Sequence, residues 1–155
     1  SRAVSMIGKY RYGVIPQAGP EGECLDAVAS EGEEMVAKST AQYGELNVTG
    51  ALDSIWEYVR RLNRLVEEEA PWKLAKDEAQ AGRLDAVLNG LASGLRLVAL
   101  AVYPVVPLTA VEILSRLGQD VGDADLLLDT ASWSALVPAP VVLGPPLFPR
   151  LETEG

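Results

Sequence analysis

The residues best suited to chemistry lie in the stretch 70–77, Ala-Pro-Trp-Lys-Leu-Ala-Lys-Asp. Pro71 ends any helix before it, because its ring removes an N–H donor, and it is favoured as the first residue of a new helix. Trp72 then lies in the first turn, beside Lys73 and one turn before Lys76. An exposed indole next to two cations is typical of a site that stacks a nucleic-acid base. The alternative is that Trp72 packs at a helix corner, since most tryptophans are substantially buried.

Most catalytic chemistry is excluded by composition. The chain has one cysteine, Cys24, and no histidine, so it offers no intrachain disulfide, zinc site of the Cys/His type, Ser-His-Asp triad or Cys-His pair. Acidic clusters at 67–69 and 120–125 are interpreted as solvated surface. The first fans around a helix, and the second lacks the Gly and the distal Glu at the positions where a calcium loop requires them. The sequence predicts a binding module with no catalytic residue and no metal site.

The charge is unevenly distributed along the chain. The net charge of −9 argues against nucleic-acid binding. However, residues 60–96 contain seven basic and six acidic residues, a net charge of +1, whereas the rest contains six basic and sixteen acidic ones, a net charge of −10. The overall charge therefore does not decide whether this chain binds RNA.

Apolar residues repeat at helical spacing in five segments, which we expect to position the 70–77 stretch. The predicted helices cover 1–11, 23–43, a segment from a cap at Asn47 or Thr49 to residue 69, 79–103, and 109–117. In the third, Trp56 lies on the apolar stripe and is predicted to be core, and Glu57 and Arg61 are spaced for an ion pair. The fourth is apolar nearly all round, which predicts the centre of a bundle, with Gly90 and Gly94 allowing close helix packing.

These patterns predict an all-α fold, an up-and-down bundle of about five helices over residues 1–118. A capping box is expected at 109–112, before the fifth helix. The chain opens inside an apolar pattern, so we expect its first helix to be truncated. Residues 119–155 are expected to form an extended tail on the bundle or on an absent domain, anchored by Trp133, Leu136, Leu147 and Phe148.

No membrane segment or signal peptide is expected. The longest uncharged apolar run, residues 97–108, is interrupted by two prolines and is shorter than the roughly 20 residues that span a bilayer. The lone cysteine favours a reducing, cytoplasmic compartment.

Several of these segments together resemble one protein family. Asp-Ser-Ile-Trp-Glu at 53–57, Val-Arg-Arg-Leu-Asn-Arg at 59–64, the stretch 69–77 and the closing 146–152 are similar to the C-terminal helical domain of bacterial methionyl-tRNA synthetases. The opening Ser1-Arg2 resembles the end of that family's Asn-Leu-x-x-Arg helix motif. The similarity runs over essentially the whole chain, in the same order.

The resemblance implies an anticodon-binding domain that recognises the CAU anticodon of methionine tRNA. It implies that Trp72 stacks on an anticodon base beside Pro71, and that Arg2 hydrogen-bonds a base edge and favours the first cytosine. Nearby cations are candidate phosphate contacts, although a charged helix face is often only solvated: Arg60, Arg61, Arg64, Lys73 and Lys76.

The resemblance also sets the expected partners. These are methionine tRNA and the catalytic domain of the same parent chain, with no DNA and no membrane. The segment itself is expected to need no cofactor, whereas the parent methionine–tRNA ligase would use ATP and magnesium. Two alternatives stay open: a helical protein–protein interaction module, and an anticodon domain of a related class I synthetase.

Overall fold

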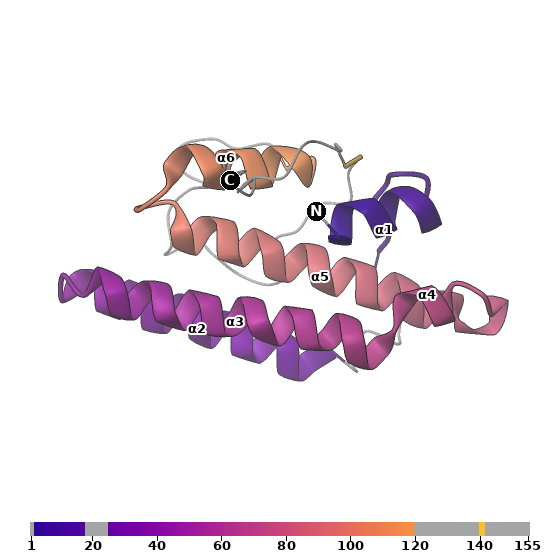
Figure 1. Cartoon of the computed structure of the whole chain (residues 1–155), viewed down its shortest axis with the longest axis horizontal. Helices are drawn as coiled ribbons and strands as arrows, with labels where there is room; N and C mark the ends of the chain where they lie inside the picture. Colours follow the sequence, from indigo (N-terminus) through magenta and orange to yellow (C-terminus); the bar gives the residue numbers. More distant parts are fainter. Residues whose placement is uncertain (1, 18–24, 120–139, 142–155) are drawn as a thin grey trace, which may run out of the picture.

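Helices make up the fold in the part of the chain that a computed structural model describes, residues 2–17, 25–119 and 140–141. In chain order they are α1 (Arg2–Tyr10), α2 (Asp26–Gly44), α3 (Val48–Glu69), the single turn α4 (Pro71–Leu74), the 3-10 turn η2 (Glu78–Gln80), α5 (Ala81–Val102) and α6 (Pro107–Arg116) (Figure 1). The described residues contain no strand beyond one isolated bridge between Val14 and Pro140. The predicted all-α fold is confirmed.

Helix α5 lies at the centre of the bundle, as its apolar composition predicts. Fifteen of its 22 residues are buried. Figure 1 shows α2 and α3 along one side of α5, and α1 and α6 along the other. The segment Glu78–Val102 is long and apolar enough to cross a membrane, but 78% of its apolar window is buried inside the protein. Its hydrophobicity is therefore explained by helix packing.

Glycines and one tyrosine set the close approach of α2, α3 and α5. A Cβ at Gly94 would lie 2.7 Å from Leu62 Cδ2 on α3, so α3 and α5 pack as closely as the glycine spacing predicts. Tyr58 was not predicted to be a core residue. It is 4% exposed, and its hydroxyl donates a hydrogen bond of 3.0 Å to the Val28 carbonyl on α2. This bond satisfies the buried hydroxyl.

The prediction that Trp56 is a core residue is wrong, because its side chain is 46% exposed. Helix α3 is covered by α2 as well as by α5, and this turns its buried face away from Trp56. The face instead comprises Ala51, Ile55, Tyr58, Leu62, Leu65 and Val66.

The predicted capping box of the last helix is also wrong. Helix α6 begins two residues earlier, at Pro107, and its N-cap residue Val106 makes no side-chain cap. Proline is well suited to this first position because the N–H that it lacks would have no helical partner there.

The expected anchors of the tail lie outside the described residues. Within the segment 119–155, the described Val141 N–H donates to the Gly13 carbonyl at 2.7 Å.

Candidate nucleic-acid interface

The corner, residues 70–77, turns the chain from α3 toward α5 without a glycine. Ala70 ends α3 in the left-handed conformation, with φ 45° and ψ 68°, and Pro71 is the first residue of α4. The Ala70 carbonyl accepts hydrogen bonds from Lys73 N at 2.8 Å and from Leu74 N at 3.3 Å. Asp77 then caps η2 by accepting from Ala79 N at 3.0 Å. Backbone hydrogen bonds and the side-chain cap of Asp77 therefore hold the corner in place.

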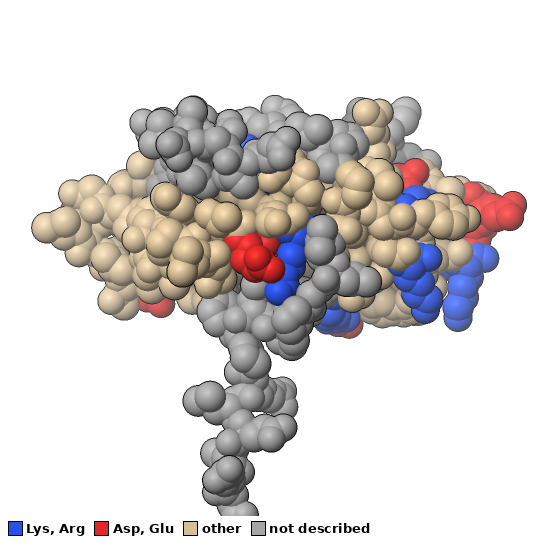
Figure 2. Space-filling view, turned by 90° about the horizontal axis from the view of Figure 1, so that it is seen from above, with Lys and Arg blue, Asp and Glu red and all other residues tan. Residues whose placement is uncertain are grey.

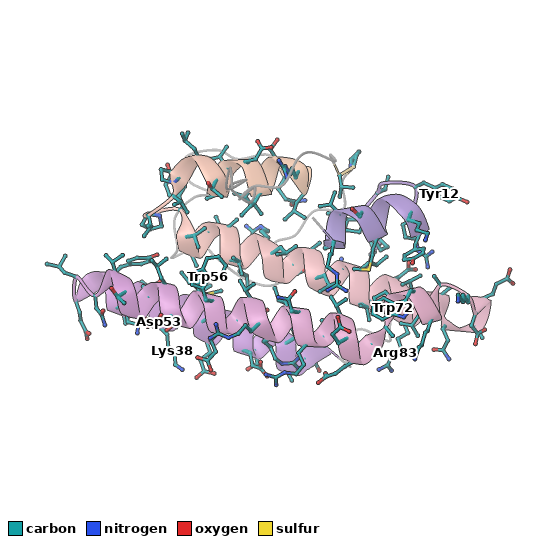
Figure 3. The ribbon with its side chains drawn as sticks, viewed as in Figure 1. Tyr12, Lys38, Asp53, Trp56, Trp72 and Arg83 are labelled. Carbon is teal, nitrogen blue, oxygen red and sulfur yellow. The ribbon has the colours of Figure 1, made fainter. Side chains whose placement is uncertain are left out.

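The side chains of α4 divide into an inner and an outer pair. Pro71 is fully buried, and Leu74 packs against two hydrophobic clusters of the bundle. Lys73 is exposed, and Trp72 is 37% exposed. Figure 3 shows Trp72 at the α4 end of the molecule, far along the bundle from Trp56. The ring of Trp72 is thus anchored at its base and accessible to a ligand.

Arg2 is brought toward the same end by an ion pair. Its Nη2 lies 3.4 Å from Glu67 Oε1, which joins the first turn of α1 to the last turn of α3, five residues before Trp72. Both side chains are more than half exposed, and such pairs are weak because water screens them. The Arg2 guanidinium can therefore exchange this carboxylate for another acceptor.

A pocket of about 290 Å³ opens beside Arg2, between α1, α3 and α5. Its polar, exposed residues are Arg2 and Asn63, and the rest of its lining is apolar: Ala3, Val59, Leu62, Val66, Leu91 and Leu95. No sequence signal indicated this pocket, because it exists only once α1 lies across α3 and α5. An apolar floor with a guanidinium and an amide beside it is suited to a planar, polar group.

Four of the five predicted phosphate contacts are exposed and form no ion pair among the residues that the structure describes: Arg60, Arg64, Lys73 and Lys76. Figure 2 shows blue side chains at the end that holds α4 and near the middle of the molecule, with red acidic side chains at both places. Lys73 and Lys76 lie in the corner with Trp72, whereas Arg60 and Arg64 lie earlier, on α3.

The fifth cation, Arg61, is already engaged. Its Nε lies 3.0 Å from Glu31 Oε2 on α2, and its Nη1 lies 3.9 Å from Glu68 Oε2. The predicted pair of Arg61 with Glu57 does not form, because Glu31 of the neighbouring helix takes its place.

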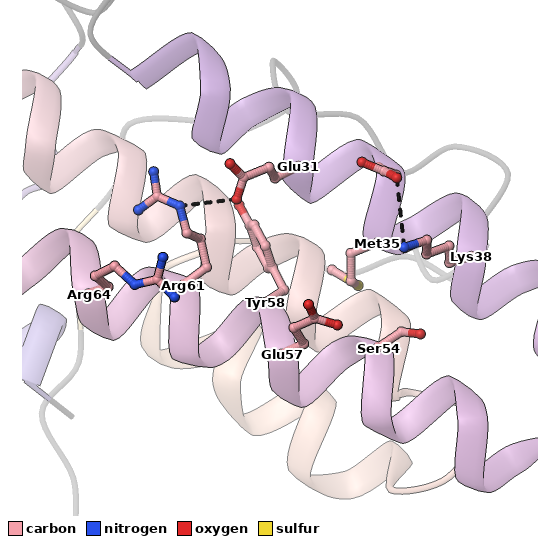
Figure 4. Close-up of a pocket in the computed structure, with 9 residues that line it drawn as sticks. Glu31, Met35, Lys38, Ser54, Glu57, Tyr58, Arg61 and Arg64 are labelled. Carbon is pink, nitrogen blue, oxygen red and sulfur yellow. Dashed lines mark hydrogen bonds and ion pairs between the residues drawn. The ribbon is translucent and has the colours of Figure 1, made fainter.

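A second pocket, between α2 and α3, contains charges of both signs (Figure 4). Three carboxylates and three cations line it: Glu31, Glu34 and Lys38 on α2, and Glu57, Arg61 and Arg64 on α3. Tyr58 also lines this pocket. Burial raises the pKa of its phenol well above the ordinary value, and the negative charge of Glu31 raises that pKa further. Because its charges balance, this pocket has little attraction for a polyanion. No group of side chains in the described part of the chain could hold a metal ion.

The acidic run 67–69 is more than solvated surface, which corrects our interpretation of it. Its side chains do fan around α3, but each meets a different arginine. Glu67 pairs with Arg2 of α1, Glu68 with Arg61 of α3 itself, and Glu69 with Arg83 of α5. The end of α3 is thereby connected to two neighbouring helices, next to the corner.

Similar sequences and similar solved structures both come from methionine–tRNA ligases. No protein-family model matches the chain. The chain is similar to the methionine–tRNA ligases of Deinococcus radiodurans (38% identical over 154 residues, 98% of this chain and 22% of that protein) and Streptococcus pneumoniae serotype 4 (36% over 156 residues, 99% and 23%). A third similar ligase is that of Caldanaerobacter subterraneus subsp. tengcongensis (32% over 160 residues, 99% and 24%).

Solved structures give the same result. The free methionyl-tRNA synthetase of Mycobacterium tuberculosis superposes with a TM-score of 0.82 at 25% identity, covering 97% of this chain and 30% of that one. The same enzyme in complex with methionyl-adenylate gives a TM-score of 0.78 at 26% identity, covering 96% and 29%. The chain spans less than a third of the length of these relatives.

Proposed function

This chain is homologous, over nearly its whole length, to a segment of methionyl-tRNA synthetases, and we propose on that premise that it is the anticodon-binding domain of such an enzyme. It would recognise the CAU anticodon of methionine tRNA, so that the parent enzyme can ligate methionine to that tRNA with ATP. The observation that carries this proposal is the exposed ring of Trp72 on a corner whose Pro71 is fully buried.

In this proposal, Trp72 stacks on an unpaired base of the anticodon loop. A flat ring on a rigid support binds a base at little entropic cost, and such stacking contributes about 1–3 kcal/mol per base. Pro71 fixes the direction in which the ring leaves the bundle. Arg2 exchanges its contact with Glu67 for a base edge, favouring the first cytosine.

Electrostatic attraction would come from a few placed cations. The proposal rests on Arg60, Arg64, Lys73 and Lys76, which have no carboxylate partner among the described residues, and less on Arg61, which already contacts two. Outside residues 60–96 the chain is strongly acidic, and this charge would disfavour non-specific RNA binding.

The ligase reaction itself would belong to the rest of the parent protein, in the cytoplasm. We expect the rest of the parent enzyme to bind the ATP and magnesium that the reaction uses. The domain would instead hold the anticodon while the catalytic domain acts on the other end of the tRNA.

Binding of RNA hairpins tests the proposal. We expect the wild-type chain to bind a methionine-tRNA anticodon stem-loop carrying CAU more tightly than one carrying UAU. Trp72→Ala should weaken binding of the CAU loop by at least about 1 kcal/mol, or roughly fivefold. Trp56→Ala is the matched control, because Trp56 is a partly exposed tryptophan away from the corner, and it should leave binding unchanged.

The alternatives predict different results. Equal binding of both loops by the wild type would overturn anticodon recognition and favour a protein-interaction module. Preference for the loop of another aliphatic amino acid's tRNA would favour a related class I synthetase.

A further inference from the structure

We propose that Glu69 and Arg83 are positioning residues, whose ion pair sets the orientation of Trp72. This inference rests on the proposed function, because it assigns a role within the same site. Neither residue need touch RNA for the role to hold.

The pair closes the corner at its base. Glu69 is the last residue of α3 and Arg83 lies in the first turn of α5, so the whole corner is contained between them. Arg83 Nε lies 2.7 Å from Glu69 Oε2, and Nη2 lies 2.9 Å from Oε1. Two parallel hydrogen bonds fix the relative orientation of the two groups, as well as their distance. The Glu69 side chain is 16% exposed and that of Arg83 is 40% exposed, so water screens this pair less than it screens the pair of Arg2 with Glu67.

The charges have the unfavourable sign for their helices. A carboxylate is disfavoured at the C-terminus of a helix, where Glu69 lies, and a cation is disfavoured at the N-terminus, where Arg83 lies. Helix stability alone would favour the opposite arrangement. The pair is therefore better explained by the geometry that it imposes between α3 and α5.

This geometry reaches Trp72 through a short segment. Only Ala70 and Pro71 separate Glu69 from Trp72, and α4 is a single turn. Figure 3 shows Arg83 and Trp72 at the same end of the bundle. A rotation of the start of α5 against the end of α3 would turn α4, and the indole with it. Glu67 and Glu68 cannot replace Glu69, because they contact Arg2 and Arg61 instead.

The test uses a chain in which Trp56→Phe and Trp133→Phe leave Trp72 as the single tryptophan. In this background we compare Glu69→Gln, Arg83→Gln, the double variant and Arg83→Lys. The readouts are acrylamide quenching and anisotropy of Trp72 without RNA, and the ratio of affinities for the CAU and UAU stem-loops. Glu112→Gln is the control, since Glu112 and Arg116 form an ion pair of 2.9 Å within α6, away from the corner.

Each single variant should at least double the quenching constant of Trp72 and lower the CAU/UAU affinity ratio at least threefold. The double variant should be no worse than either single one, because each change breaks the same pair. Arg83→Lys should restore part of the ratio, and Glu112→Gln should change neither readout. Glu69→Asp, which keeps the charge but shortens the side chain, serves if the glutamine variants do not fold.

Loss of stability with an unchanged affinity ratio and unchanged quenching would show a merely structural role and overturn the inference. Additive effects of the two single changes would also overturn it. If the wild type binds both loops equally, the proposed function fails, whereas quenching of Trp72 still decides whether the pair orients the ring.

Discussion

Two ends of the bundle use the same backbone conformation in different surroundings. Ala70, after α3, and Leu46, after α2, both have positive φ values, 45° and 61°, which residues other than glycine rarely adopt. Ala70 is 8% exposed, and the fully buried Pro71 follows it. Leu46 is 90% exposed, and the turn around it is held by backbone hydrogen bonds such as Asn47 N to the Gln42 carbonyl at 2.8 Å.

The difference shows what each turn does. A left-handed residue persists only where its surroundings stabilise it, and the corner supplies a buried proline and the Glu69–Arg83 pair. The turn at Leu46 reverses the chain and exposes its side chain to solvent. In the corner, the same conformation at Ala70 leads into the turn that carries Trp72, which is 37% exposed. We therefore expect the corner to tolerate change far less well.

The largest effect is expected from Ala70→Val. A β-branched residue at positive φ is strained, and the nearly buried position leaves little room for two more methyl groups. We expect the free energy of unfolding to fall by about 2–3 kcal/mol. Urea denaturation followed by circular dichroism measures this change.

Leu46→Val is the matched control for this prediction. It adds a β-branched residue at positive φ where no packing opposes it, and should cost about 1 kcal/mol or less. If Ala70→Val and Leu46→Val lower the free energy of unfolding equally, the corner is no less tolerant of change than the turn at Leu46.

The sequence predicted best those features that depend on a residue and its near neighbours in the chain. Pro71 at a helix start and the central place of α5 follow from the ring chemistry of proline and from apolar residues on every face. The exposure of Trp72 was not decided by its residue type, because a packed corner and an accessible ring have the same local sequence.

What the sequence could not supply depends on how the helices rotate against one another. Trp56 fits the apolar period of α3, but the covering of α3 by both α2 and α5 leaves it at the edge. Arg61 has an acceptable partner one turn away, yet Glu31 on another helix takes it. Likewise, the pocket beside Arg2 requires three helices to meet.

Alkaline pH should affect the Leu46 end and the bundle centre before the corner. Burial raises the pKa of Tyr43, whose hydroxyl donates to the Ala101 carbonyl at 2.8 Å near that end, and the pKa of Tyr58 between α2 and α3. Stability is then complete below the ordinary tyrosine pKa of about 10 and falls above it, because the unfolded chain loses these protons first. The expected slope is about 1.4 kcal/mol per pH unit for the buried Tyr58, and a smaller loss is expected for Tyr43, which is only partly buried.

Unfolding free energies between pH 8 and pH 11 measure this slope. Tyr58→Phe should cost about 1 kcal/mol at pH 8, for the lost hydrogen bond, and should reduce the slope above pH 10. If Tyr58→Phe leaves the slope of unfolding free energy against pH unchanged, groups other than Tyr58 cause the loss of stability at alkaline pH.

The smallest expected effect is on the salt dependence of RNA binding, and it comes from the unpaired lysines of the corner. Lys73 and Lys76 are exposed in the corner and have no ion pair among the described residues, whereas Lys38 on α2 lies 3.7 Å from Glu34. Each lysine that contacts a phosphate releases a counterion, so Lys73→Gln or Lys76→Gln should reduce the dependence of log affinity on log salt by about 0.7 for a single-stranded loop.

Titrations of the CAU stem-loop at several salt concentrations give this dependence, with Lys38→Gln as the control of equal charge. Lys38→Gln should leave the slope unchanged, because removing a paired cation far from Trp72 alters no phosphate contact. If all three variants shift the slope equally, the attraction comes from net charge alone. The two ends would then differ in shape but not in their affinity for the RNA backbone.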